Sequence, residues 1–183
     1  MAVPTCPTNC ATALPAVSFS NCAPEINLSE IVYVYVAKNI AADFTDWEDP
    51  AEWATRLSQT STTGDDYIRT LTVIADKPAP QKNRRDISGG RSIVPNKTHT
   101  LNVTIDETND TVHDLVRVLE CNGLYKIWYE TLSGHRFGGN EGIKDANLNL
   151  DLLLNRGQEE IMTYGGTIEW KSKFTEERTA AFV

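Results

Sequence analysis

The sequence predicts a mainly β fold with one main helix, arranged as an antiparallel sandwich or half-barrel of six or more strands. At least six short segments carry the two-residue apolar alternation of strands or a continuous apolar run, and one carries the helical spacing. Because most of these strands have one polar face, we expect antiparallel pairing, with the helix packed against one end or face of the sheet.

Six segments are the expected strands. Residues 99–106 are the clearest, because their apolar residues, from Leu101 to Ile105, alternate with polar ones. Residues 31–36 are apolar on both faces and should be covered on both sides. Residues 162–166 can extend the last strand into a hairpin with the strand before it. The full set is 31–36, 68–75, 99–106, 124–131, 147–154 and 167–174.

Two helices are expected. Residues 110–121 form the main helix, with an N-cap among residues 108–110 and a left-handed stop at Gly123. A lesser helix is expected over residues 46–59, capped by Asp49. The apolar stripe of the main helix is Val112, Leu115, Val116 and Leu119.

The chain has 183 residues, with 17 basic and 25 acidic side chains and a net charge of −8. This length fits one β-rich globular domain at residues 26–183. Residues 1–25 are rich in Pro, Thr and Ser and are expected to form an extended N-terminal arm. No apolar run approaches the roughly 18 residues of a membrane helix, and the acidic balance argues against general nucleic-acid binding.

Three of the four cysteines lie near the N-terminus. Cys6, Cys10 and Cys22 are candidate metal ligands, but their spacing is not that of a standard zinc site. The start of the chain lacks the basic and apolar regions of a secretory signal, so we expect a reducing compartment. We favour free thiols in an ordered arm, and we predict no metal and no cofactor.

Residues 76–96 separate two expected strands and are long for a connection in a compact domain. Three prolines, a Gly-Gly pair and five basic residues predict an irregular loop arm that protrudes from the domain. The alternatives are a solvated mobile loop, an arm that docks on an acidic neighbour such as another copy of this chain, and a nucleic-acid contact without stacking aromatic residues. The candidate inter-subunit residues are Lys77, Lys82, Arg84, Arg85, Gly89, Gly90 and Arg91.

Two acidic clusters are further candidates for chemistry. Each can be interpreted as a divalent-metal site or as a helix N-terminus lined with acids, and neither has the spacing of an EF-hand loop. No motif for a nucleophile, a phosphate-binding loop or a metalloprotease is present, so we expect the protein not to be an enzyme. The clusters are Asp43, Asp46, Glu48, Asp49 and Glu52, and Asp106, Glu107, Asp110 and Asp114.

The order of the elements resembles that of tail tube proteins of long-tailed bacteriophages. An N-terminal arm precedes a strand, residues 76–96 link two strands, and a strand ending at residues 104–110 runs into the main helix. The helix returns through Cys121-Asn-Gly into further antiparallel strands, which end at residues 166–174. Residues 104–110 and 136–140 also resemble segments of structural proteins of phages.

The resemblance implies a structural virion protein that is assembled in the host bacterial cytoplasm. Copies of the chain would form a ring, expected to be a hexamer, and the rings would stack into a tube through which DNA passes without specific binding. Residues 76–96 would be the long hairpin arm that, with the chain termini, ties successive rings together, and other virion proteins would be further partners. The resemblance implies no catalytic residues and no membrane.

Two alternatives remain open. The first is a capsid decoration protein or a head–tail connector ring. The second is a non-catalytic β-sandwich that binds a ligand through the aromatic residues Trp47, Trp53, Trp128 and Tyr129. Because Trp128 and Tyr129 are adjacent on a strand, they point to opposite faces and cannot line one site together.

Overall fold

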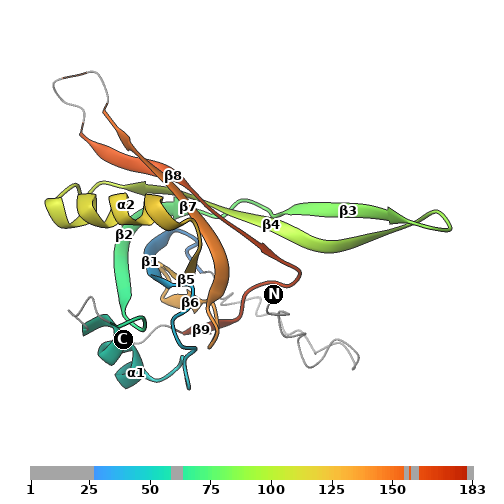
Figure 1. Cartoon of the computed structure of the whole chain (residues 1–183), viewed down its shortest axis with the longest axis horizontal. Helices are drawn as coiled ribbons and strands as arrows, with labels where there is room; N and C mark the ends of the chain where they lie inside the picture. The colour runs from blue at the N-terminus through green and yellow to red at the C-terminus, as the bar shows by residue number, and fades with distance from the viewer. Residues whose placement is uncertain (1–26, 59–63, 155–156, 158–160, 181–183) are drawn as a thin grey trace, which may run out of the picture.

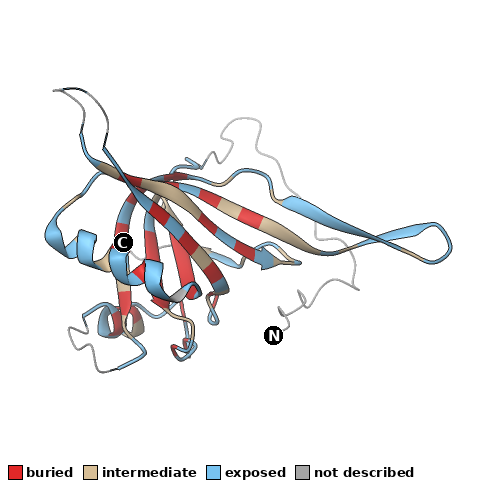
Figure 2. Ribbon diagram, turned by 45° about the horizontal axis from the view of Figure 1, so that its top comes forward, coloured by how far each residue is buried: buried red, intermediate tan, exposed pale blue. Residues whose placement is uncertain are grey.

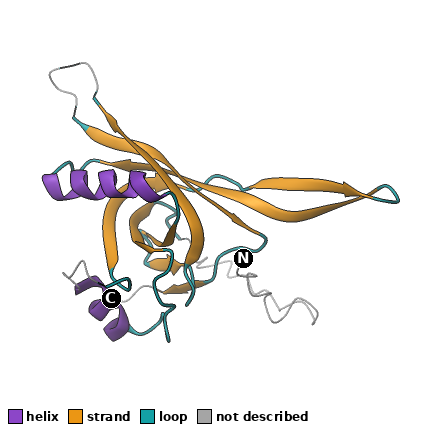
Figure 3. Ribbon diagram, viewed as in Figure 1, coloured by secondary structure: helices purple, strands orange, loops and turns teal. Residues whose placement is uncertain are grey.

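A computed structural model describes residues 27–58, 64–154, 157 and 161–180, which fold into nine strands and two helices (Figures 1 and 3). All six expected strands and both expected helices are present, with shifted ends, so the predicted mainly β class with one main helix is confirmed. The elements are β1 (Ile31–Lys38), α1 (Pro50–Ser58), β2 (Ile68–Asp76), β3 (Gln81–Ile87), β4 (Arg91–Ile105), α2 (Asp110–Asn122), β5 (Tyr125–Thr131), β6 (His135–Phe137), β7 (Ile143–Leu153), β8 (Thr163–Ser172) and β9 (Arg178–Ala180).

Six strands close into an antiparallel barrel, in the order β1-β2-β4-β8-β7-β5 and back to β1. The closing pair, β1 with β5, runs from Ile31 opposite Thr131 to Lys38 opposite Tyr125. β7 permits closure because its first residues pair with β5 and its later residues pair with β8. The expected sandwich or half-barrel is therefore corrected to a closed barrel. The pairing that closes it joins segments too far apart in the chain for their periodicity to indicate it.

The barrel interior is apolar, and α2 contributes to it. The alternation predicted for β4 places Leu101, Val103 and Ile105 inside, each at most 3% exposed. Val116 and Leu119 of α2 belong to the same buried cluster. The helix thus covers the barrel beside β7, as Figure 1 shows.

Both helices begin at their predicted caps. Asn109 accepts a hydrogen bond of 2.9 Å from a backbone N–H in the first turn of α2, and that helix ends at Gly123, whose φ is 72°. The Asp49 carboxylate likewise accepts a hydrogen bond of 2.9 Å from a backbone N–H in the first turn of α1. α1 is shorter than the predicted 46–59, because the residues before Pro50 form a turn. No helix in the described part of the chain is long and apolar enough to cross a membrane.

β1 is covered on both sides, as its two apolar faces predicted. Val34 and Val36 pack inside the barrel, whereas Tyr35 and Ala37 pack into a second apolar cluster outside it. α1 and the segment before it form the cover of this second cluster. Its members are Tyr35, Ala37, Ala41, Phe44, Trp47, Trp53, Ile68 and Trp128.

The β7–β8 hairpin extends to residue Thr163, as the predicted extension over residues 162–166 requires. The backbones of β7 and β8 approach each other closely at Gly166, which lies opposite Leu150. A Cβ atom on Gly166 would lie 1.9 Å from the carbonyl oxygen of Asn149, so the approach of the two strands depends on glycine at this position.

The substitution Gly166→Ala should therefore destabilise the barrel by roughly 2–4 kcal/mol, because the new methyl group meets backbone that cannot rotate away. Gly134→Ala is the matched control: Gly134 has a φ of 72°, but nothing lies within 4 Å of its Cβ position. The control should cost only about 1 kcal/mol of backbone strain. Urea unfolding curves measure both values, and equal losses would contradict the close approach.

Candidate interaction site

The segment predicted as an irregular loop is a β-hairpin. β3 pairs with the first half of β4, from Gln81 opposite Thr98 to Ile87 opposite Arg91, and the ribbon projects away from the barrel (Figure 1). We call residues 81–97 the arm. The prolines and glycines that suggested a loop instead lie before β3, in the turn, and at an irregularity in the ribbon.

Gly89 and Gly90 form the turn of the arm, with φ values of 81° and 71°. The register of the arm shifts between Asn83 and Arg85, so that two residues of β4, one of them Pro95, lie opposite a single residue of β3. A β-bulge accommodates proline because the backbone there lacks its regular hydrogen bonds. The composition of the arm therefore fits a bulged hairpin as well as it fits a loop.

The arm has almost no core of its own. Every residue from Gln81 to Asp86 is exposed, and Figure 2 shows the outer part of the ribbon in the colour of exposed residues. Among the described strands, β3 pairs with β4 alone. Because an isolated two-stranded ribbon is marginally stable in water, the arm depends on its attachment to the barrel and on any partner it meets.

The arm is basic and the rest of the chain is acidic. Residues 76–96 contain five of the 17 basic residues and two of the 25 acidic ones, which gives this segment a charge of +3 and the remainder −11. Of the predicted inter-subunit residues, six lie in the hairpin: Lys82, Arg84, Arg85, Gly89, Gly90 and Arg91.

The seventh predicted residue, Lys77, lies before the hairpin, at the root of the arm. Its side chain is only 20% exposed.

A buried polar cluster anchors the arm root. Lys77 Nζ lies 2.5 Å from a carboxylate oxygen of Glu176 and 3.2 Å from the hydroxyl oxygen of Tyr129. The Glu176 side chain is 4% exposed and also accepts a hydrogen bond of 3.2 Å from the indole N–H of Trp170. Burial and the Glu176 charge raise the pKa of Tyr129, so its hydroxyl stays protonated. The cluster joins the start of the arm to the segment after β8.

His99 lies on the β4 side of the same root. Its ring stacks on Trp170 with an interplanar angle of 10°, and its Nδ1 lies 3.2 Å from Glu176 Oε1. Burial lowers the pKa of His99 below its usual 6.5; Glu176 opposes this shift, and Lys77 and Lys97 add to it. At neutral pH the imidazole is therefore uncharged, and its contact with Glu176 is not an ion pair.

Sequence reasoning missed this cluster. Glu176 is 99 positions from Lys77 in the chain. The one available signal was the alternation of β4, which places His99 on the same face as Leu101 and Val103 and hence inside the barrel. A histidine on an apolar face suggests a buried partner but does not identify it.

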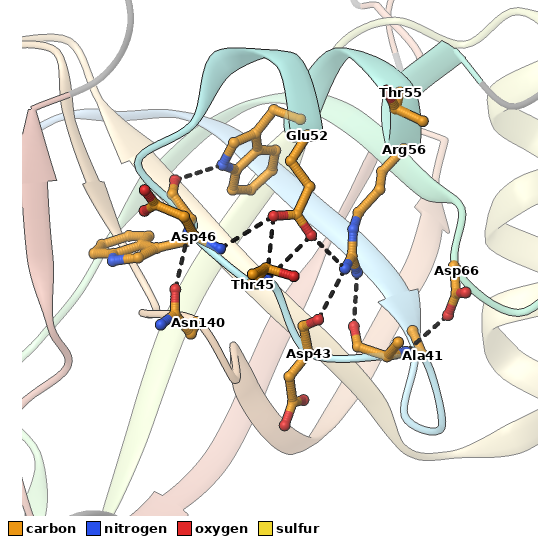
Figure 4. A network of polar contacts seen from close by, with 12 residues as sticks. Ala41, Asp43, Thr45, Asp46, Glu52, Thr55, Arg56, Asp66 and Asn140 are labelled. Atoms are coloured by element: carbon orange, nitrogen blue, oxygen red, sulfur yellow. Dashed lines mark hydrogen bonds and ion pairs between the residues drawn. The ribbon is translucent and has the colours of Figure 1, made fainter.

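The acidic cluster before and within α1 is structural (Figure 4). Glu52 accepts the backbone N–H groups of Thr45 and Asp46 and pairs with Arg56 at 2.8 Å. Asp43 pairs with Lys126 at 2.7 Å. In the described residues no three His, Cys, Asp or Glu side chains are placed to hold a metal ion, and Cys6, Cys10 and Cys22 lie outside these residues.

The aromatic residues considered for ligand binding are buried, which corrects the expectation that they are exposed. Trp47, Trp53, Trp128 and Tyr129 are 6%, 2%, 0% and 3% exposed. Trp128 packs in the outer cluster and Tyr129 in the barrel, on opposite faces of β5 as predicted. They form parts of two cores and offer no aromatic surface to a ligand.

Comparisons with known proteins gave no match. No protein family model matches the sequence, and neither the curated proteins nor the solved structures include a significant relative.

Stability should fall as the pH is lowered below about 6.5, because His99 takes up a proton in the unfolded chain more readily than in the folded one. The stability that the neutral His99 contributes is fully present above pH 6.5, and it is lost as the pH falls from 6.5 to the lowered pKa of His99 in the folded state. His99→Gln should flatten this part of the urea stability profile between pH 7.5 and 5.5, whereas His113→Gln, which alters a contact between α2 and Tyr164 but leaves His99 in place, should retain it. Equal profiles for the two variants would contradict the assignment.

Glu176→Gln should cost roughly 3 kcal/mol, because it leaves the Lys77 ammonium beside Tyr129 and Trp170 without its counter-charge. Glu169→Gln is the control, since Glu169 is an exposed residue of β8. Hydrogen exchange shows where the stability is lost. The amides of residues 97–101 at the arm root should lose protection in Glu176→Gln and keep it in Glu169→Gln. Unchanged protection there would show that the cluster does not anchor the arm.

Proposed function

We propose that this chain is a structural virion protein that self-assembles into rings stacked as a phage tail tube, through which DNA passes. The observation that carries the proposal is the arm: an exposed, basic, two-stranded ribbon on an acidic body. A ribbon with this little burial gains stability when a neighbour covers it.

The charge asymmetry supports association between copies of the chain. The segment 76–96 carries +3 and the remainder −11, so the arm of one copy is attracted to the body of the next. Arm and body are different surfaces, and such a head-to-tail contact either closes into rings or propagates as a stack. The resemblance noted in the sequence supplies the expectation of a hexameric ring and of other virion proteins as partners.

The acidic body also fits a channel for DNA. A wall that carried many basic residues would bind phosphates by releasing their counterions and would hold the duplex in place. A chain with a net charge of −8 repels DNA instead and lets it slide. This role needs no catalytic residue, metal or cofactor.

The exposed arm would also suit a protein that binds to one site on the virion and does not stack on further copies of itself. A head–tail connector ring and a capsid decoration protein are of this kind. The two functions differ in their products. A tube protein gives long stacks of rings, whereas a connector gives single rings and a decoration protein gives small oligomers. Negative-stain electron microscopy of the untagged protein, with mass photometry, separates these outcomes.

Removal of the arm should abolish tubes and leave the subunit folded. Residues 83–96 are replaced by Asn-Gly, because Lys82 and Lys97 face each other in the ribbon and this dipeptide closes a two-residue hairpin. The root cluster and the barrel remain intact, so the unfolding midpoint should stay close to that of the wild type. Electron microscopy and mass photometry at matched concentration measure the loss of assembly.

Two triple variants test whether the charge of the arm, and not only its length, drives assembly. Each removes three positive charges without shortening the chain. Arg84→Gln, Arg85→Gln and Arg91→Gln together should prevent tubes, whereas Arg117→Gln, Lys171→Gln and Lys173→Gln, at exposed positions of α2, β8 and the segment after β8, should not. Long tubes from the arm-deleted chain would contradict the proposal, and so would a wild-type chain that stays monomeric at high concentration.

A further inference from the structure

A hollow of about 1070 Å³ lies beside the root of the arm. Part of its lining is a row of paired residues across four strands: Ile74 of β2, Thr104 of β4, Gly165 of β8 and Asp151 of β7. Their neighbours along these strands, such as Val103, are in the barrel core. Because successive residues of a strand point to opposite faces, the row faces away from the core and toward solvent.

Exposed apolar side chains form part of the lining of the hollow. Ile74 is 55% exposed and Leu153, which also lines the hollow, is 44% exposed. The Leu153 side chain lies 2.7 Å from the position of a Cβ atom on Gly165, so it covers a site that glycine leaves open. Exposed apolar side chains gathered in a concave surface indicate a contact with another molecule.

The lining of the hollow also carries exposed carboxylates. Glu30, Asp76 and Asp151 line it and are exposed, and Arg178 is the exposed basic side chain among its lining residues. Lys77 and Glu176 also line it, but they neutralise each other. The lining of the hollow therefore combines an excess of negative charge with exposed apolar side chains.

The arm has the complementary chemistry. Arg84, Arg85 and Arg91 provide positive charge on an exposed ribbon, and Ile93 is an apolar side chain that is 45% exposed. We propose that the hollow is the receiving site for the arm of a second copy of this chain. This inference rests on the proposed function and identifies the surface that the arm contacts.

The occupant is a second copy because the arm cannot reach its own hollow. Asp76 and Lys77 line the hollow and lead directly into the arm, which then runs straight away from the barrel (Figure 1). The pairing from Gln81 with Thr98 to the turn holds the ribbon extended. Each copy thus offers a hollow at the root of its arm and basic residues farther out, and repetition of this contact joins copies head to tail.

Charge reversal tests the contact. The hollow variant Glu30→Lys with Asp151→Lys, and the arm variant Arg85→Glu with Arg91→Glu, at two positions on the same face of the ribbon as Ile93, should each raise the concentration needed for assembly by roughly tenfold or more at low salt. The chain that carries all four substitutions restores opposite charges across the contact. Its assembly, measured by sedimentation and electron microscopy, should return to within about threefold of the wild type.

The control places the same charge change elsewhere. Asp110→Lys with Asp114→Lys, at exposed positions of α2, should not impair assembly and should not rescue the arm variant. Rescue of the arm variant by this control would show that net charge alone restores assembly, and it would overturn the assignment of the hollow as the receiving site. If the arm variant fails to assemble but the hollow variant assembles normally, the proposed function stands and the hollow is overturned. A wild-type chain that does not self-associate would overturn both.

Discussion

The pairing of β1 with β5 is the interaction on which the other features of the structure depend. It joins the two ends of a six-stranded sheet and so closes the barrel. It also places β1 between two apolar layers, the barrel interior on one side and the α1 cluster on the other. Both helices, the outer cluster and the root of the arm are positioned relative to this closed wall.

The arm departs from the barrel at a buried charge. Removing the Lys77 ammonium and the Glu176 carboxylate from water is costly, and their contact with each other and with Tyr129 and Trp170 offsets that cost. The geometry of this cluster fixes where the arm begins. The basic, exposed ribbon projects away from the acidic body.

This separation of charge suits the proposed assembly. If the arm folded back on the carboxylates of its own barrel, its charge would be satisfied within one chain. Held extended, it keeps its basic side chains exposed and available to another molecule. The hollow beside the arm root offers both the carboxylates and the exposed apolar side chains that the proposed contact would use.

The sequence by itself determined the local structure and the charge distribution. The alternation from Leu101 to Ile105, the helix cap at Asn109 and the stop at Gly123 are properties of neighbouring residues, so they could be predicted from order alone. The basic character of residues 76–96 was equally evident. These features rest on backbone preference and side-chain periodicity, which act over a few residues.

Only the tertiary structure decided the closed barrel, the hairpin form of the arm, the burial of Trp128 and the cluster at Glu176. Each of these depends on contacts between segments whose separation in the chain hides them from any periodicity. The prolines and the glycine pair of the arm are compatible with both a loop and a bulged ribbon, and pairing with β4 selects the ribbon. Long-range pairing, not local preference, therefore determines which surfaces of this protein remain free to meet a partner.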